Sequence, residues 1–430
     1  MEALPDAIIQ YILSNMKNAR DIASCTCVSK RWKESMPFIR SLYFPRNSFD
    51  DNRTDPDSIV GRMISSTVCL EELIIYCPFS HSSLSSWLLM KSPSLRHLEL
   101  RMDSISEKRI SPEFPMKLDC IDSARGLETL KLWGVLIIQS PNWGLFQNLR
   151  SLEIVGARLK DNALMDAIRA CPSLTNLALL GCDGVRSVSI ELQHLEQCRL
   201  DFYGRGDCSL SLSSPKLQLL DVQGCCWIQV NGNHCLRNLS IANNAGLNRV
   251  TTSVNDVPGK LYKAELGKLA ALEYLSIRGV QWCWNAIFSI LQNASEVEHL
   301  VMKIEFCGDF NKLDPFPEVD LVDFFNSHLK LQKFEIHGAM FAALSQKNSL
   351  RRLDSRFSIP CLEEVVITVR SPLNAEQKLS TLESLVKCSR KLRRMVIRVS
   401  QMKSCQHSAD DFFEEICRFK CMNHKIIRIE

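Results

Sequence analysis

The hexapeptide LRHLEL, residues 95–100, contains the pattern that decides the fold of this chain. An apolar residue is followed by two variable residues, an apolar residue, one variable residue and a last apolar residue. In an extended backbone alternate side chains point to opposite sides, so Leu98 and Leu100 would lie on one face and Glu99 on the other. The hexapeptide therefore predicts a short strand with one buried face, which a single copy would leave in water.

The same pattern recurs along most of the 430 residues. Copies begin at Leu70, Leu95, Leu127, Leu149, Leu174, Leu195, Leu217, Leu236, Leu272, Val297, Leu331, Leu362 and Leu392. Their mean spacing is about 27 residues, inside the range of roughly 20 to 29 that is typical of leucine-rich repeats. Stacked copies bury a continuous core. We therefore expect an α/β fold in which residues 46–400 form a leucine-rich-repeat solenoid, or horseshoe, with a concave parallel sheet.

The segments between the copies predict a convex side of mixed structure. Five of them have apolar residues three and four positions apart, which indicates helices over 81–91, 160–171, 284–295, 319–328 and 375–387. Between about 174 and 241 the copies lie closer together and the segments alternate, which indicates extended chain at 187–192, 208–214 and 227–232. Residues 242–268 are rich in Asn, Gly and Pro and are expected to form a surface loop.

The first 45 residues do not follow the repeat pattern. Leu4 and Pro5 are expected to open a helix, with Asp6 near its positive end. Ile8, Ile9, Ile12, Leu13 and Met16 then give this helix one broad apolar face. Further helices are expected over 20–25 and over 28–36, the last ended by Pro37. Because three short helices form a very small core, surplus apolar surface is expected to need a partner.

These residues resemble a known family. The run LPDAIIQYILS from Leu4 to Ser14, followed by ARDI at 19–22 and VSKRW at 28–32, is similar to an F-box over residues 1–45. Together with the repeats, it makes the chain resemble a plant-type F-box/leucine-rich-repeat protein. CLEEVVI at 361–367, CSRKLRRMVIRV at 388–399 and DDFFEEICRF at 410–419 resemble an FBD-type tail, so an FBD-like cap is expected over 358–430, overlapping the last repeats.

The resemblance implies the substrate-recognition subunit of an SCF-type cullin-RING E3 ubiquitin ligase. Such a subunit performs no chemistry: its F-box binds a Skp-family adaptor, and through it the cullin, while its repeats hold a target protein. Carried over by position, the adaptor contacts would be Leu4, Pro5, Ile8, Ile12, Met16, Val28 and Trp32. Ile9, Leu13 and Ile22 are instead expected to pack inside the helices, whereas Leu4 and Pro5 lie where little of the chain could cover them.

No catalytic, metal or cofactor site is expected. The chain contains neither a G-x-S-x-G nor a G-x-x-x-x-G-K-[ST] motif, and its 19 cysteines include no C-x-x-C pair. Cys417, Cys421 and His424 have a spacing suited to a metal but lack an obvious fourth ligand, so buried thiols are the favoured interpretation. The cysteine count is odd and below the density of a disulfide-stapled secreted protein, which favours a reducing compartment and free thiols.

Charge and hydropathy exclude other classes of partner. The net charge of +4 is too small and diffuse to indicate nucleic-acid binding, and basic residues between Lys387 and Lys403 are expected to pair with flanking acids. No signal peptide and no apolar run long enough to cross a membrane is visible, so the expected location is cytoplasmic, nuclear or both. A non-catalytic repeat scaffold and a small-ligand sensor within the solenoid remain alternatives, and the target cannot be named.

Overall fold

The computed structural model describes residues 4–47, 55–102, 118–203, 208–243, 263–279, 284–304, 319–348, 357–399 and 406–430, together with Phe49 and Trp282. The chain divides into two compact units, Met1–Tyr203 and Gly204–Glu430. They are called unit 1 and unit 2 below, and each is described by itself.

Every copy of the repeat pattern forms a strand, as predicted, and in each unit these strands lie in a parallel sheet in chain order. In unit 1 the order is β1(Ser41–Phe44), β2(Glu72–Ile75), β3(His97–Arg101), β4(Thr129–Trp133), β6(Ser151–Val155), β8(Asn176–Cys182) and β10(Gln197–Phe202). In unit 2 it is β12(Leu219–Gln223), β14(Asn238–Asn243), β16(Tyr274–Gly279), β17(His299–Ile304), β18(Lys333–His337), β19(Glu364–Val369), β20(Arg394–Val399) and β21(Ile427–Ile429).

The apolar positions of the pattern make the core. Leu95, Leu98 and Leu100 are each at most 1% exposed, and burying a leucine side chain contributes roughly 1.5 to 3 kcal/mol. Neighbouring strands are in register by pattern position, so that Leu98 lies beside Leu130. The repeated spacing therefore stacks equivalent leucines into one continuous layer.

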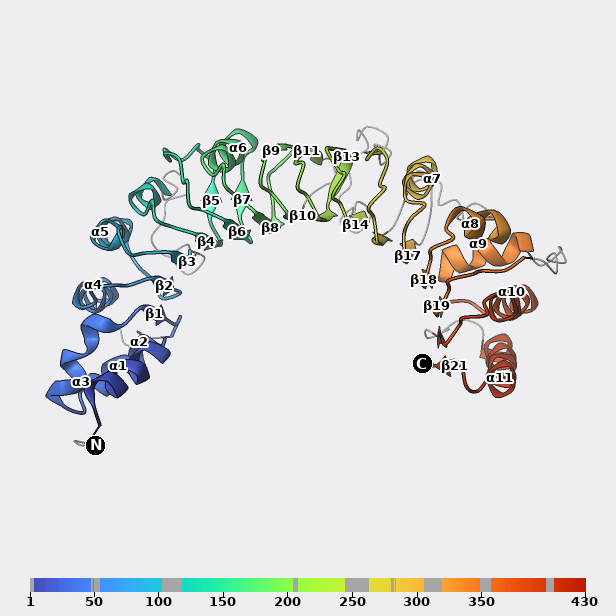
Figure 1. Cartoon of the computed structure of the whole chain (residues 1–430), viewed down its shortest axis with the longest axis horizontal. Helices are drawn as coiled ribbons and strands as arrows, with labels where there is room; N and C mark the ends of the chain where they lie inside the picture. Colours follow the sequence, from blue (N-terminus) through green and yellow to red (C-terminus); the bar gives the residue numbers. More distant parts are fainter. Residues whose placement is uncertain are drawn as a thin grey trace. The chain divides into compact units, whose positions relative to one another are not determined.

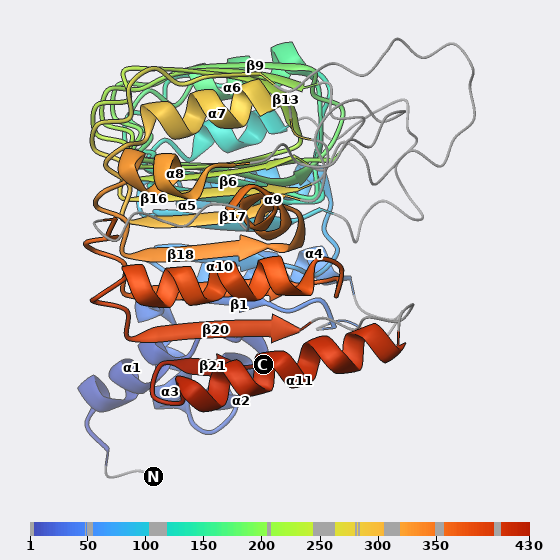
Figure 2. The same cartoon turned by 90° about the vertical axis from the view of Figure 1, so that its right-hand side faces the viewer.

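Helices cover one face of the strands and leave the other face open (Figure 1 and Figure 2). Unit 1 has α4(Pro56–Ser66), α5(His81–Lys91), the 3-10 helix Leu118–Ser123 and α6(Asp161–Arg169), and unit 2 has α7(Trp284–Asn293), α8(Leu321–Ser327), α9(Gly338–Asn348), α10(Ala375–Cys388) and α11(Gln406–Met422). All five helices predicted between the copies are present within about two residues of their predicted ends, whereas α4 and α9 were not predicted. The uncovered side is called the open face below.

The closely spaced copies have strands in place of helices, as predicted. These are β9(Ser187–Glu191) in unit 1, and β11(Cys208–Ser213) and β13(Cys225–Asn231), a parallel pair in unit 2; unit 1 also has the short pair β5(Leu136–Ile137) and β7(Arg158–Leu159). A helix needs more residues than these repeats offer. Of the predicted loop 242–268, residues 244–262 lie outside the described residues. The prediction was wrong at the end of this range, where β15(Lys263–Glu265) is a strand that pairs with β13.

Gly279 shows how tightly adjacent repeats pack. Its φ is +113°, and a Cβ there would lie 1.9 Å from the carbonyl oxygen of Asn243. The last position of β16 therefore requires glycine, both for its backbone angle and for this close approach.

The N-terminal helices are α1(Asp6–Asn15), α2(Ala19–Thr26) and α3(Lys30–Glu34). The third is shorter than the predicted 28–36, and Pro37 does not end it, because Pro37 lies inside a 3-10 helix, Met36–Phe38, that follows. Pro is tolerated in the first turn of a helix, where its missing N–H is not needed. β1 comes three residues later and was not predicted, although Ile39, Leu42 and Phe44 match the repeat pattern and are buried.

Candidate functional site

The N-terminal helices enclose a small core. Ile9, Leu13 and Ile22 are at most 1% exposed, as predicted for packing residues, and Trp32 of α3 is 7% exposed. Of the residues expected to contact an adaptor, Trp32 is thus the one whose side chain is already covered within the chain. It can support a binding surface chiefly by holding α3 in place.

Around this core the helices present apolar side chains to solvent. Ile8 and Val28 are 44% and 49% exposed, Pro5 is exposed, and Leu4, Ile12 and Met16 are half-buried. Tyr11 is 67% exposed and belongs to the same surface, one helical turn from Ile8. We call these seven residues the N-terminal apolar surface. Sequence reasoning missed Tyr11, although its spacing of three from Ile8 was a usable signal.

Arg31 of α3 fixes the start of the chain. Its guanidinium donates from Nη2 to the carbonyl oxygen of Leu4 at 2.7 Å, and from Nε and Nη2 to Oδ1 of Asp6 at 2.9 and 2.6 Å. Charge-assisted contacts of this kind are stronger than neutral hydrogen bonds. These contacts hold the segment Leu4–Asp6 against α3, although Asp6 and Arg31 are 25 residues apart in the sequence. No local sequence pattern indicates this contact.

Met16 and Lys17 connect the N-terminal helices to their surroundings. The Cys25 thiol of α2 lies 3.8 Å from the Met16 sulfur. Lys17 accepts a hydrogen bond from the backbone N–H of Tyr43 in β1 and pairs with Glu72 of β2 at 2.8 Å. Burial alone would raise the pKa of Glu72, but hydrogen bonds from Lys17 and Ser41 lower it below its usual value. The end of α1 is therefore joined directly to the first two strands.

The open face of unit 1 has an aromatic cluster built around one carboxylate. Oε1 of Glu99 accepts hydrogen bonds from the Tyr76 hydroxyl at 2.5 Å and from the Trp133 indole at 2.9 Å. Tyr43 packs edge-on against Tyr76, and the Arg101 guanidinium lies 5.8 Å from the centre of the Tyr76 ring. Burial and the neighbouring Glu99 carboxylate raise the pKa of Tyr76. Tyr, Trp and Arg are the residues most enriched at interface hot spots.

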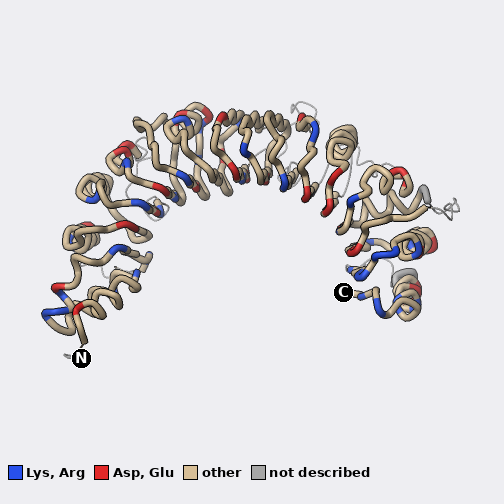
Figure 3. The backbone as a smooth tube through the Cα atoms, viewed as in Figure 1, with Lys and Arg blue, Asp and Glu red and all other residues tan. Residues whose placement is uncertain are grey.

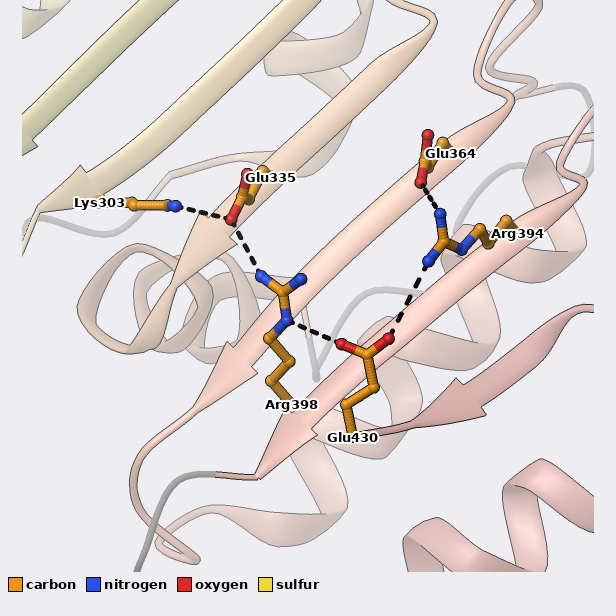
Figure 4. Close-up of polar contacts among 6 residues, drawn as sticks. All are labelled: Lys303, Glu335, Glu364, Arg394, Arg398 and Glu430. Carbon is orange, nitrogen blue, oxygen red and sulfur yellow. Dashed lines mark hydrogen bonds and ion pairs between the residues drawn. The ribbon is translucent and has the colours of Figure 1, made fainter. Parts of the chain in front are cut away.

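The open face of unit 2 has an ionic chain instead (Figure 4). Glu335 pairs with Lys303 at 2.8 Å and with Arg398 at 3.4 Å. Glu430 pairs with Arg398 at 3.1 Å, and Arg394 pairs with Glu364 at 2.9 Å. Arg394 and Arg398 are among the basic residues that were expected to be paired, and they are. Their partners, however, are Glu335 of β18, Glu364 of β19 and Glu430 directly after β21, not acids of the flanking helices.

The described residues also bear on metal sites, membrane-spanning helices and reactive thiols. Within the described ranges, no group of three or more His, Cys, Asp or Glu is placed to hold a metal ion. None of the helices in that part of the chain is long and apolar enough to span a membrane. Cys171 is buried, and burial raises its pKa to about 12, which keeps the thiol protonated and unreactive. Cys417 and Cys421, for which buried thiols were the favoured interpretation, are half-buried and exposed respectively, so that interpretation was wrong for Cys421.

Comparisons with known proteins agree with the N-terminal geometry. Residues 1–38 match the F-box-like domain family. Over 432 aligned residues the chain is 57% identical to "F-box protein At1g10780" of Arabidopsis thaliana, with 100% of both chains covered. "F-box/FBD/LRR-repeat protein At3g52680" of the same plant is 26% identical over 47% of this chain and 45% of its own length. "Putative FBD-associated F-box protein At5g56390" is 23% identical over 63% of this chain and 64% of its own length. The chain therefore belongs to the F-box proteins.

Proposed function

We propose that this protein is the non-catalytic substrate receptor of an SCF-type cullin-RING ubiquitin ligase. Residues 1–45 would bind a Skp-family adaptor, and through it the cullin. Residues 46–400 would form the solenoid that holds a target protein for ubiquitination, ended by an FBD-like cap over 358–430. The observation that carries the proposal is the exposed N-terminal apolar surface on helices that match the F-box family.

Physical chemistry supports a partner at this surface. Leu4, Pro5, Ile8, Ile12, Met16 and Val28 leave apolar area in contact with water, and a contiguous apolar patch of this kind marks an interaction site. The Arg31 contacts hold Leu4 and Pro5 in one conformation before binding. Such preorganisation lowers the entropy cost of association. An adaptor that covers this surface would remove its apolar side chains from water, which the small core of the N-terminal helices cannot do by itself.

The experiment is binding of the full-length chain to a Skp-family adaptor, measured by copurification and by calorimetry. We expect Leu4→Ala with Pro5→Ala to weaken the complex about a thousandfold, since each truncated hot spot can cost 2 kcal/mol or more. The control is Leu89→Ala with Met90→Ala, an exposed apolar pair on α5. Adaptor binding that survives the first change intact would contradict the proposal.

Two other functions would be recognised in the same experiment. A repeat scaffold would be monomeric, well folded and unable to bind any adaptor, with its N-terminal helices only capping the repeats. A small-ligand sensor would carry a bound adduct when purified from its own cells, which native mass spectrometry detects. Capture of partners with and without residues 1–45 then separates repeat-bound targets from ligase components.

A further inference from the structure

Unit 2 contains a pocket of about 300 Å³ at the C-terminal ends of β17, β18 and β19, bounded by α9 and α10. Its apolar wall includes Ile304, Phe341 and Val369, and its polar groups include His337, Arg370 and Lys378. The volume is at the small end for ligand sites and suits one side chain or a fragment of similar size better than a large molecule.

Lys378 gives this pocket an unusual group. The side chain is 5% exposed, and Nζ donates to the carbonyl oxygens of Ser371 and Leu373, each at 2.6 Å. Nζ also lies 5.9 Å from the centre of the Phe412 ring. Among the described residues no carboxylate lies within ion-pair distance of it. Buried charges are normally paired with an opposite charge, and burial lowers the pKa of Lys378 to about 8.

Lys91 in unit 1 is a second buried lysine, and it does not line this pocket. It is 6% exposed, donates to the carbonyl oxygen of Thr67, and has a pKa lowered by burial. Its contact joins the end of α5 to the end of α4, and it is absent from the pocket wall. Lys91 shows that a buried lysine can be purely structural in this fold. It therefore serves as the control for any function assigned to Lys378.

The open face beside the pocket is basic. The outward side chains of β16–β21 include six basic residues, Arg278, Lys303, Lys333, Arg394, Arg398 and Arg428, and two acidic ones, Glu335 and Glu364, with Glu430 directly after β21. Figure 3 shows both charges on these strands. On β1–β10 of unit 1 the corresponding residues are Arg101, Lys131 and Arg199 against Glu72, Glu99, Glu153 and Asp201. Among these strands the basic excess thus lies on β16–β21, which include the three strands whose ends line the pocket.

We propose that this pocket receives a carboxylate side chain from an acidic segment of the target protein. The inference rests on the proposed receptor function and names the chemistry of its substrate. The methylenes of a glutamate would lie against Ile304, Phe341 and Val369, and its carboxylate would pair with Lys378, with Arg370 in the same pocket wall. Further acidic residues of the same segment would lie along the basic open face, where Lys303 and Arg398 occupy equivalent positions on β17 and β20.

Charge pattern favours a peptide over a nucleic acid. Glu335, Glu364 and Glu430 lie between the basic side chains and would repel an unbroken phosphate backbone. Carboxylates spaced along a flexible chain can avoid them. Electrostatic complementarity of this kind gives specificity and a salt-dependent association rate.

The test is fluorescence anisotropy of the full-length chain with a labelled peptide of alternating Glu and Ser, about 12 residues long, in about 50 mM NaCl so that screening is weak. We expect Lys378→Met, which removes the charge, and Ala342→Phe, which fills the pocket, to weaken binding at least about tenfold. Lys91→Met is the control and should bind like the unmodified chain. Unchanged binding in both pocket variants would overturn the proposal, with thermal unfolding verifying that each variant is folded.

Two further arms identify the source of the carboxylate. If free glutarate displaced the peptide at equal concentration, the site would belong to small carboxylates, and if a single-stranded RNA of similar length bound more tightly, it would belong to nucleic acids. Either result would overturn the proposal. Adaptor binding is measured on the same samples, so failure of the pocket is distinguished from failure of the receptor function.

A pH series separates a binding role of Lys378 from a structural one. Its ammonium loses its proton as pH rises through about 8, so affinity for the acidic peptide should fall in that range. The other ionisable groups lining the pocket are His337 of β18 and Arg370 at the end of β19, while α9 and α11 contribute apolar side chains. Arginine stays charged throughout. Lys378→Arg should therefore keep the affinity and lose the pH dependence, and an unchanged pH profile in that variant would contradict the assignment.

Discussion

The N-terminal helices and the strands β17–β21 leave surfaces of opposite chemistry exposed to water. Ile8, Tyr11 and Val28 make the first surface apolar, whereas Lys303, Glu335 and Arg398 make the second ionic. Apolar association depends on buried area and little on salt, while exposed charges are screened within about 10 Å at 0.1 M salt. One chain thus presents one surface suited to a partner held by apolar burial and another suited to a partner selected by charge. The changes below test this difference between the two surfaces, and the largest expected effect comes first.

Trp32→Ala is expected to have the largest effect, because it empties a buried site in the small helical core. We expect a loss of about 3 to 5 kcal/mol in unfolding free energy for the N-terminal helices. Ile8→Ala, on the exposed side, should leave stability within about 0.5 kcal/mol and weaken adaptor binding instead. Urea unfolding followed by tryptophan fluorescence and calorimetry with the adaptor measure the two effects. Equal destabilisation by both changes would remove the distinction between core and surface.

Glu335→Gln breaks the ionic chain at its least exposed carboxylate. The Glu335 side chain is 18% exposed and pairs with both Lys303 and Arg398, so its loss leaves two cations facing each other and should cost about 1 to 3 kcal/mol. Glu363→Gln is the control, since its pair with Arg393 is 4.0 Å long and open to solvent. That change should cost less than about 0.5 kcal/mol. Urea unfolding at low salt compares them, and equal costs would show that the chain of charges acts as separate surface pairs.

Arg31→Ala tests whether the start of the chain must be held for adaptor binding. We expect affinity to fall about tenfold, which corresponds to 1.4 kcal/mol, because Leu4 and Pro5 then lose their preorganised conformation. Lys33→Ala, on the same helix and exposed, is the control. Arg31→Lys should recover only part of the affinity, because lysine cannot make the forked contact. If stability falls in Arg31→Ala while affinity does not, Arg31 has no positioning role.

The Lys17–Glu72 pair should give the smallest effect, seen in the pH dependence of stability. The pKa of Glu72 is lower in the folded chain than its ordinary 4.5. Its contribution is therefore present above about pH 4.5 and is lost as pH falls through the folded value. Glu72→Gln should flatten this part of the curve by less than about 1 kcal/mol. Unfolding measured between about pH 3 and 6 tests it, and an identical curve for the variant would show that the pair contributes nothing.

Local patterns predicted the thirteen repeat strands, but β1, α9 and β21 were missed for three different reasons. The thirteen predicted strands follow from leucines at fixed spacing. β1 was missed because IRSLYF, residues 39–44, was assigned to the F-box, although it has the same pattern. α9 was missed because GAMFAALSQKN begins directly after β18 and has no clear polar face. β21 has a histidine, His424, at the first apolar position of the pattern.

The candidate sites were predictable only where they depend on neighbours in sequence. Ile8 and Ile12 follow from helical spacing, and the family resemblance supplied Leu4, Pro5 and Val28. Arg31 contacts a residue 25 positions away, and Arg398 pairs with Glu335 across 63 positions. Contacts of this length depend on how strands are stacked, which no local period encodes.

The hydrogen bond from Tyr43 to the carbonyl of Lys17 makes the first strand a direct continuation of the N-terminal helices. Successive strands are then spaced by about 4.8 Å with a constant twist. In unit 1 the number of repeats therefore sets the distance between the N-terminal helices and each later strand. Under the proposed receptor function, inserting or deleting one repeat would shift a target protein bound farther along by about one strand spacing. It would thereby change which lysines of that target come within reach of the ligase.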